Sequence, residues 1–308
     1  MKIKVHNWQG KANGLISALK KKGATIVKKG EADIFLIDFD GAVGYYTKKI
    51  EDAYKDGATV VLYSHGAPVI SAWDGIWEPN RHSALYLAQS PGQKEVMESY
   101  GYPIPIIVIG WHYCKLKTFK PVKDIKKVLF APWHPHGSGF LAPLRMQANT
   151  DTYEKLCSMP YELSVMYVGD IIRNGLKKDG RAEFIESDKS INFSLKQIDS
   201  ADVVVSNLMT VASLAIARGK PVVVYGQHIF PCDGYAKEGL KFTAHWDNYK
   251  ELMRYPYDIS ELKPKASQYL LQHAALHEAT EWRDLFIGNP LDADKLFRVL
   301  EQILEKES

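Results

Sequence analysis

The first third of the chain alternates apolar runs with segments that carry apolar residues at helical spacing. Six runs have the composition of buried strands: KIKVHNW, GATIVKK, ADIFLIDF, ATVVLYSH, ALYLAQS and IPIIVIGW. The segments GLISALKKK and YYTKKIEDAYKDG lie between some of them and have the spacing of amphipathic helices. Because parallel strands are buried on both faces, such runs normally alternate with covering helices. The pattern predicts a parallel sheet with helices packed on it.

A second series of the same kind follows residue 127. Its strand candidates are KKVLFA, YELSVMYVG, AEFIES, DVVVSN and KPVVVYG, and its helix candidates are YEKLCSM, SLKQIDSA and TVASLAIARG. Two longer helical patterns, SQYLLQHAALHEATEWRDLF and DADKLFRVLEQILEKE, come last. The basic segment 115–127 separates the two series and is predicted to be a linker. We therefore expect an α/β protein of two Rossmann-like domains, residues 1–120 and 121–308, with a cleft between them and helices at the C-terminus.

Charge is divided unevenly between the two series. Residues 1–127 hold 19 Lys and Arg against 12 Asp and Glu, whereas the rest of the chain holds 20 against 24. A positive excess favours an anionic partner for the first domain, with Lys20, Lys21 and Lys22 as candidate contacts. A lysine-rich solvated surface is the alternative.

Composition excludes several classes of protein. The cysteines Cys114, Cys157 and Cys232 are odd in number and lack paired spacing, which indicates a reducing, cytoplasmic setting. No run approaches about 18 apolar residues, so we expect neither a membrane-spanning helix nor a signal peptide. No metal site is predicted, because His134 and His136 lack further ligands near them in sequence. Glycine-rich dinucleotide and Walker motifs are absent, which disfavours NAD enzymes and P-loop NTPases.

A histidine follows the strand candidate TVVLY in the loop SHGAP. A glycine and a proline at the carboxyl end of a buried strand indicate a tight loop, and open α/β sheets bind ligands at that edge. Because the pKa of imidazole lies near neutrality, His65 is a candidate general base, with Ser64 and Gly66 beside an acceptor. A core histidine at a strand end is the alternative. Trp73 is a candidate to stack on the acceptor, or else it packs in a core.

The segment DSADVVVSNLMTVASLAIARG places Ser206 and Asn207 between a buried strand and a helix that is predicted to begin at Met209 or Thr210. The first N–H groups of a helix lack intrahelical partners, and the helix dipole favours an anion there. The hydroxyls of Ser206, Thr210 and Ser213 add donors. The pattern predicts a phosphate site, and plain N-capping by Ser206 or Asn207 is the alternative.

The strand KKVLFA is followed by the polar loop PWHPHGSG. A flexible, glycine-containing loop at the carboxyl end of a strand suits contact with a phosphate or a ribose. His134, His136 and Ser138 are therefore candidate donor-binding residues.

Four segments occur in an order that resembles the CDP-glycerol glycerophosphotransferase family, the teichoic-acid polymerases. They are SHGAP, LYLAQSPGQKEVMESYGYPIPIIVIGW, KKVLFAPWHP and ADVVVSNLMTVASLAIARGKPVVVY. The first is similar to the family's histidine-glycine-threonine-proline loop, and the last to its aspartate-tyrosine-serine-serine strand–helix unit. The resemblance implies a GT-B fold, a nucleotide-diphosphate donor on the C-terminal domain and an acceptor at the N-terminal domain. It also implies that His65 is the catalytic base and that Thr210 binds donor phosphate.

The chain departs from the family's pattern at several positions. Asn207 replaces an aspartate, Met209 replaces a serine, and VMYVGD stands in place of a lysine-x-histidine-proline motif. These departures leave the transferred group open, so that it is either glycosyl or glycerophosphoryl.

We expect a GT-B transferase that uses a nucleotide-diphosphate donor as co-substrate and needs no other cofactor. Its acceptor is expected to be an anionic phosphoglycan or polymer, or DNA with hydroxymethylated pyrimidines, with no integral membrane contact. An epimerase or hydrolase of nucleotide sugars is an alternative, although Ser213 stands where related 2-epimerases hold ribose with a glutamate. A binding protein without catalytic activity is a further alternative.

Overall fold

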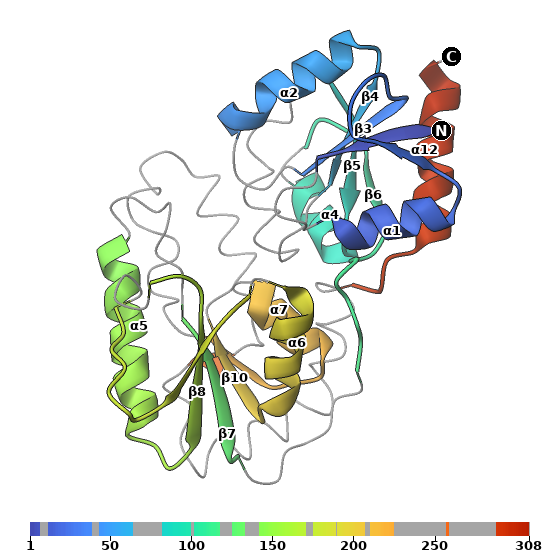
Figure 1. The fold of residues 1–308 in the computed structure, drawn as a ribbon. Helices are drawn as coiled ribbons and strands as arrows, with labels where there is room; N and C mark the ends of the chain where they lie inside the picture. The colour runs from blue at the N-terminus through green and yellow to red at the C-terminus, as the bar shows by residue number, and fades with distance from the viewer. Residues whose placement is uncertain are drawn as a thin grey trace. The chain divides into compact units, whose positions relative to one another are not determined.

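The computed structural model divides into two compact units (Figure 1). Unit 1 comprises Met1–Cys114 and Asp284–Ser308, and unit 2 comprises Lys115–Arg283. The structure describes residues 1–6, 12–38, 43–63, 82–99, 102–117, 125–132, 142–170, 175–188, 190–206, 210–224, 257–258 and 288–307.

Unit 1 is built on a parallel sheet of order β2-β1-β3-β4-β5-β6. Its strands are β1 (Lys2–Val5), β2 (Thr25–Val27), β3 (Ile34–Asp38), β4 (Thr59–Tyr63), β5 (Ser83–Ala88) and β6 (Ile106–Val108). Each of the six apolar runs forms one of these strands, which confirms the sequence prediction. Every residue of the central strands β3 and β4 is buried, as expected where helices cover both faces of a sheet.

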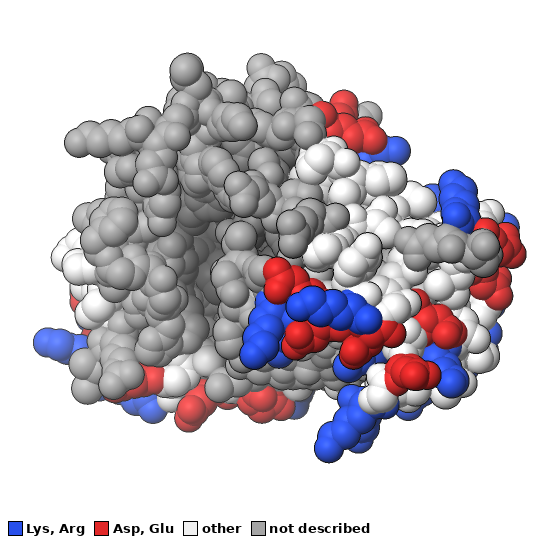
Figure 2. All heavy atoms as spheres, turned by 90° about the horizontal axis from the view of Figure 1, so that it is seen from above, with Lys and Arg blue, Asp and Glu red and all other residues white. Residues whose placement is uncertain are grey.

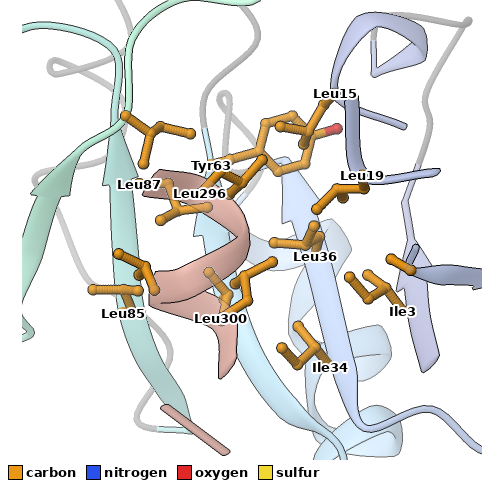
Figure 3. Close-up of a cluster of buried hydrophobic side chains, with 14 of the residues drawn as sticks. Ile3, Leu15, Leu19, Ile34, Leu36, Tyr63, Leu85, Leu87, Leu296 and Leu300 are labelled. Atoms are coloured by element: carbon orange, nitrogen blue, oxygen red, sulfur yellow. The ribbon is translucent and has the colours of Figure 1, made fainter. Parts of the chain in front are cut away.

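Four helices accompany this sheet in the described part of unit 1: α1 (Asn13–Lys21), α2 (Val43–Lys55), α4 (Pro91–Ser99) and α12 (Ala293–Glu307). Leu15 and Leu19 of α1 are buried one turn apart and pack in the same apolar cluster as Ile3 of β1. Figure 3 shows these side chains pointing into one layer between helix and sheet. Leu15 and Leu19 thus form the buried apolar face of α1 that the spacing of its residues predicted.

The C-terminal helix α12 belongs to unit 1, which corrects the expectation that residues 121–308 form the second domain. Leu296 and Leu300 of α12 are fully buried in the cluster that contains Leu36 and Leu87 of the first sheet (Figure 3). Asp292 stabilises the start of α12 by accepting a hydrogen bond from the Lys295 N–H at 2.9 Å. An amphipathic pattern reveals that a helix has an apolar face, but not which sheet that face covers.

Unit 2 contains a second parallel sheet, of order β12-β11-β10-β7-β8-β9. Its strands are β7 (Lys127–Ala131), β8 (Glu162–Tyr167), β9 (Glu183–Glu186), β10 (Val203–Ser206), β11 (Val222–Val224) and β12 (Tyr257–Asp258). The first five match the predicted strands, whereas β12 was not predicted. The chain enters unit 2 at Lys115, where the predicted linker begins.

The described helices of unit 2 are α5 (Ala142–Cys157), α6 (Ile191–Ser200) and α7 (Thr210–Ala217). Ser190 caps α6, because its Oγ accepts a hydrogen bond from the Phe193 N–H at 3.2 Å. The sequence pattern found only the end of α5, whose first turns are not strongly amphipathic. The helical pattern SQYLLQHAALHEATEWRDLF lies outside the described residues.

The returning C-terminal segment lies against the chain just after β6. The Trp111 N–H donates a hydrogen bond to the carbonyl oxygen of Asn289 at 2.9 Å. Gly110 has a φ of +86°, and a Cβ there would lie 2.5 Å from the carbonyl oxygen of Pro290. Glycine is therefore required at this position for its conformation and for the close approach of the two segments.

Gly110→Ala is predicted to lower the melting temperature more than Gly57→Ala does. Both glycines have positive φ, 86° and 81°, so each substitution incurs about 1–2 kcal/mol of left-handed strain. A Cβ on Gly57 meets nothing within 4 Å, so only Gly110→Ala also displaces the C-terminal segment. Thermal and urea unfolding of both variants measure the difference, and equal losses of stability would contradict this account.

Candidate functional site

The order of strands in unit 2 reverses between β7 and β10. Strands β8 and β9 lie on one side of β7, whereas β10, β11 and β12 lie on the other side. Open parallel sheets bind ligands outside the carboxyl ends of the strands at such a switch point. The last residues of the two strands, Ala131 and Ser206, are paired in register. The ends of β7 and β10 therefore lie side by side at this point.

Ser206 is a buried polar residue at the switch point. Its exposed fraction is 0%, and its Oγ has no hydrogen-bond partner in the described part of the chain. The hydroxyl therefore does not cap α7, and the plain N-capping interpretation is wrong for Ser206. A buried hydroxyl without a partner costs about 1–3 kcal/mol. Such a group in a native structure calls for an explanation, and a ligand at the switch point would satisfy it.

Helix α7 begins at Thr210, as the sequence predicted. Thr210 is half-buried at the start of the helix, and Ser213 is buried one turn further on. The N–H groups of the first turn carry the positive end of the helix dipole and have no acceptors within the helix. The strand end and the helix start thus combine hydroxyl donors with a partial positive charge, which is suited to a phosphate group.

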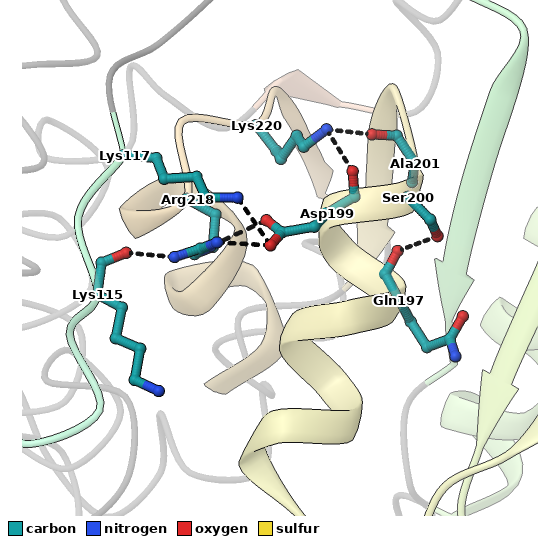
Figure 4. A network of polar contacts seen from close by, with 8 residues as sticks. All are labelled: Lys115, Lys117, Gln197, Asp199, Ser200, Ala201, Arg218 and Lys220. Carbon is teal, nitrogen blue, oxygen red and sulfur yellow. Dashed lines mark hydrogen bonds and ion pairs between the residues drawn. The ribbon is translucent and has the colours of Figure 1, made fainter.

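A polar network around Asp199 of α6 anchors the opposite end of α7 (Figure 4). Arg218 donates from Nε and Nη2 to the two carboxylate oxygens at 2.9 and 2.5 Å, and Lys117 Nζ lies 2.9 Å from Oδ2. The Arg218 hydrogen bonds, with Lys117, hold the pKa of Asp199 down at about 2. Lys220 Nζ donates to the backbone oxygens of Asp199 and Ala201 at 3.0 and 2.6 Å. Because these contacts tie α7 to α6, they fix the axis along which the N-terminus of α7 points.

Most of the remaining candidate residues lie outside the described residues. They are His134, His136, Ser138 and Asn207 in unit 2, and Ser64, His65, Gly66 and Trp73 in unit 1. Chain connectivity still places the first group directly after β7 and β10, and the SHGAP loop directly after β4. Trp111 of unit 1 is fully buried, so it packs in a core.

The candidate lysines lie at the other edge of the first sheet. Because α1 runs from the carboxyl end of β1 back to the amino end of β2, its last turn lies at the amino edge. Lys20 and Lys21 are exposed there, and Lys22 forms an ion pair with Asp294 of α12. Tyr63, the last described residue of β4, lies at the opposite, carboxyl edge of the same sheet.

The described surface does not gather charge of one sign on the face in Figure 2. Lysine and arginine side chains lie beside aspartate and glutamate side chains in that view. Among the residues with described positions, no three His, Cys, Asp or Glu side chains are grouped to hold a metal ion. No helix in the same part of the chain is both long and apolar enough to cross a bilayer.

Sequence analysis missed a second polar cluster, at the carboxyl edge of unit 1. His6 follows β1 directly, and its Nε2 lies 3.0 Å from Nζ of Lys49 in α2. Asp38 is the last residue of β3 and is 1% exposed. The signal was present in sequence, since KIKVHNW and ADIFLIDF both place an ionisable residue after an apolar run. The same signal had singled out His65 after TVVLY.

No protein-family model matches the chain, and no curated protein matches it in sequence. Solved structures do match it. The wall teichoic acid polymerase TagF is 13% identical with a TM-score of 0.57, covering 100% of this chain and 89% of that one. The S. aureus MnaA–UDP co-structure is 11% identical with a TM-score of 0.57, covering 99% and 96%. UDP-GlcNAc 2-epimerase from Neisseria meningitidis bound to UDP-GlcNAc is 13% identical with a TM-score of 0.52, covering 99% of both chains.

The fold is GT-B. Both the polymerase and the epimerases match nearly the whole chain, and each unit has the parallel sheet and covering helices of a Rossmann-like domain. This confirms the fold class that the sequence resemblance implied. At this low sequence identity, structural similarity establishes the fold alone. The chemistry follows from the residues of the site.

Ser206→Ala is predicted to stabilise the free protein while weakening nucleotide-diphosphate binding. Removal of the unsatisfied hydroxyl should add about 1 kcal/mol of stability, whereas loss of a hydrogen bond to a charged phosphate should weaken binding about tenfold or more. Thermal unfolding and titration calorimetry with UDP and CDP measure the two effects.

Ser83→Ala is the matched control for this variant. The Oγ of Ser83 is also buried without a partner among the residues that the structure describes, but it lies at the amino end of β5 in unit 1. This variant should gain stability and keep the affinity of the wild type for nucleotides. An equal loss of affinity in both variants would remove Ser206 from the site.

Proposed function

We propose that the protein is a transferase that moves a glycosyl or glycerophosphoryl group from a nucleotide-diphosphate donor to a hydroxyl of an anionic acceptor. The observation that carries this proposal is the buried, unpartnered hydroxyl of Ser206 at the switch point of unit 2, just before the N-terminus of α7. The GT-B fold supports the same class of ligand, because similar structures of that fold are described with UDP and with UDP-GlcNAc bound.

Unit 2 binds the donor in this proposal. The hydroxyls of Ser206 and Thr210 donate to the phosphate oxygens, and the dipole of α7 adds to their effect. The residues His134, His136, Ser138, Asn207 and Ser213 complete the donor site. No metal ion is needed to neutralise the phosphates, because N–H groups and hydroxyls take that role.

His65 of unit 1 is the general base in this proposal. The acceptor oxygen forms a bond to the transferred group while the bond from that group to the leaving phosphate oxygen breaks. The electron pair of the broken bond goes to the leaving nucleotide, and the proton of the acceptor hydroxyl goes to His65. Hydroxyl donors and the dipole of α7 stabilise the charge that develops on the leaving phosphate.

A thermal-shift screen of nucleoside diphosphates and their sugar conjugates tests donor binding. A nucleotide at about 100 times its dissociation constant should stabilise the protein by about 2.7 kcal/mol. At least one nucleotide should do so, and Thr210→Val should weaken it about tenfold or more by removing one hydroxyl donor to a charged group. A screen in which no nucleotide stabilises the protein would contradict the proposal.

His65→Ala is predicted to abolish transfer and leave donor binding intact. Removal of a general base costs ~10²–10⁴-fold in rate, whereas the imidazole makes no contact with the donor in this mechanism. Release of the nucleotide in the presence of acceptor measures the rate, and calorimetry measures donor affinity. A variant that keeps more than about a tenth of the wild-type rate would restore the core-histidine interpretation of His65.

An epimerase activity is the second candidate, because two of the similar structures are described as UDP-N-acetylglucosamine 2-epimerases. An epimerase changes the donor without any acceptor, whereas a transferase releases nucleotide only when an acceptor hydroxyl is present. Incubation with UDP-GlcNAc alone, followed by NMR of the sugar, separates the two activities. Ser213, in place of a ribose-binding glutamate, favours the transferase.

The class of acceptor is predicted to show in the dependence of binding on salt. DNA contacted at about six phosphates should lose about 10³-fold in affinity between ~50 and ~200 mM salt, whereas a small phosphoglycan should change far less. Binding of hydroxymethylated DNA and of a phosphoglycan, each measured across this salt range, distinguishes the two. If DNA neither binds nor accepts a sugar at low salt, the DNA alternative is wrong.

A further inference from the structure

The chain enters unit 2 at Lys115, and the residues that follow are bound to the C-terminal end of α7 (Figure 4). Lys117 donates its N–H to the carbonyl oxygen of Ala217 at 2.9 Å. Arg218, the first residue after α7, donates from Nη1 to the carbonyl oxygen of Lys115 at 3.1 Å. We call residues 115–117 the crossing segment. Unit 2 therefore holds the crossing segment from its first residue.

The crossing segment satisfies one of the carbonyl groups at the end of α7. The last four carbonyl oxygens of a helix have no N–H partner within it. The chain that turns back after α7 donates to the carbonyl oxygens of Ala215 and Ile216. The carbonyl oxygen of Ala217 accepts the N–H of Lys117, which is distant in sequence. The crossing segment thus caps the C-terminus of the helix whose N-terminus is the proposed phosphate site.

The carboxylate of Asp199 strengthens this connection. It accepts from Nε and Nη2 of Arg218 at 2.9 and 2.5 Å, and from Nζ of Lys117 at 2.9 Å. A guanidinium that binds both oxygens of one carboxylate has a fixed orientation, which leaves Nη1 of Arg218 to donate to Lys115. The Arg218 side chain is 12% exposed, whereas that of Lys117 is 50% exposed. Arg218 is therefore the main contact, and the exposed ion pair of Lys117 is the weaker one.

Helix α7 links the crossing segment to the proposed phosphate site. Its eight residues span about 12 Å. Every residue from Ala212 to Ala217 is buried, and the helix packs against β10 and β11. Close packing leaves such a helix little freedom to move apart from the strands that it covers. One rigid element therefore holds the crossing segment at one end and the proposed phosphate site at the other.

We propose that Arg218, together with Asp199 and Lys117, is a positioning residue for the transfer reaction, because it fixes the crossing segment to the helix that binds the donor. In the proposed function the donor and His65 belong to different units, which the chain joins at this crossing and again where it returns to unit 1. The effective concentration of one group near another falls as the connecting chain becomes longer and more flexible. Fixing residues 115–117 to α7 shortens that connection. The inference rests on the proposed function, and it assigns these residues a share in the transfer rate and none in donor binding.

Arg218→Gln releases the crossing segment and tests this role. In the ligand-free chain, NMR should show that the protection of the Lys117 amide against hydrogen exchange falls about tenfold or more, because hydrogen bonds to a charged group are lost. The kcat of transfer should fall about three- to tenfold, because the freed segment lengthens the connection. The Kd of UDP and of CDP should stay at the wild-type value. Transfer is followed as nucleotide release from UDP-GlcNAc and from CDP-glycerol, each with a phosphoglycan acceptor.

Lys117→Met and Lys115→Met form a matched pair, which decides the question if Arg218→Gln does not fold. Each removes one positive charge from an exposed lysine of the crossing segment. Lys117 reaches Asp199, whereas Figure 4 shows the Lys115 side chain pointing away from it. Because Lys117→Met removes an exposed ion pair, it should lower the protection of the residue-117 amide about two- to fivefold, and kcat with it. Lys115→Met should match the wild type in both measurements.

The outcomes separate this role from the proposed function. If Arg218→Gln releases the amide but keeps the wild-type kcat, the network is purely structural and the positioning role is wrong. The role is also wrong if the variant weakens UDP or CDP as much as it lowers kcat, because the effect then arises at the phosphate site. Equal behaviour of the two lysine variants would contradict the part assigned to Lys117. If no nucleotide stabilises the wild type, the donor site itself is wrong and the positioning role falls with it.

Discussion

A sheet of parallel strands must be covered by helices on both faces, and the rest of this structure depends on that constraint. In unit 1 part of the cover comes from the end of the chain, because Leu296 and Leu300 of α12 complete the core around β3 and β5. The chain therefore has to leave unit 1 after Cys114 and return to it from unit 2. The close approach at Gly110 follows from this return, since the incoming segment lies directly against the outgoing one. Unit 1 cannot complete its core from its first 114 residues alone.

The same constraint limits where chemistry can take place. Once helices cover both faces of a sheet, its polar side chains can meet a ligand only at the edges where the strands end. Neighbouring strands diverge at a switch point, which leaves room outside their carboxyl ends. Ser206 in unit 2 and His6 in unit 1 both stand at such points. The two sheets differ in strand order, β2-β1-β3-β4-β5-β6 in unit 1 and β9-β8-β7-β10-β11-β12 in unit 2, yet each has one such switch point.

The sequence was sufficient to predict features that depend on local chemistry. The apolar runs predicted every described strand of both sheets except β12. The hydroxyl residues after DVVV predicted that α7 begins near Thr210, where the structure has its start. Features that depend on strand order were not predictable in this way. The switch point at His6 is visible only once β1 is known to lie between β2 and β3. Likewise, the count of positive charges did not reveal that Lys20 and Lys21 lie at the amino edge, and β12 is too short to leave a pattern.

The amino edges of the two sheets share one hydrogen-bonding pattern, made by an aspartate in each unit. Asp33, just before β3, donates its N–H to the backbone oxygen of Lys2 at 2.9 Å and accepts the Lys2 N–H at 2.6 Å. Asp202, just before β10, donates its N–H to the backbone oxygen of Lys127 in β7 and accepts the Lys127 N–H, with both distances at 2.9 Å. Each aspartate therefore joins the two strands that flank a switch point, at the end away from the ligand. The repeated alanine-aspartate pair before an apolar run marks this arrangement in both halves of the sequence.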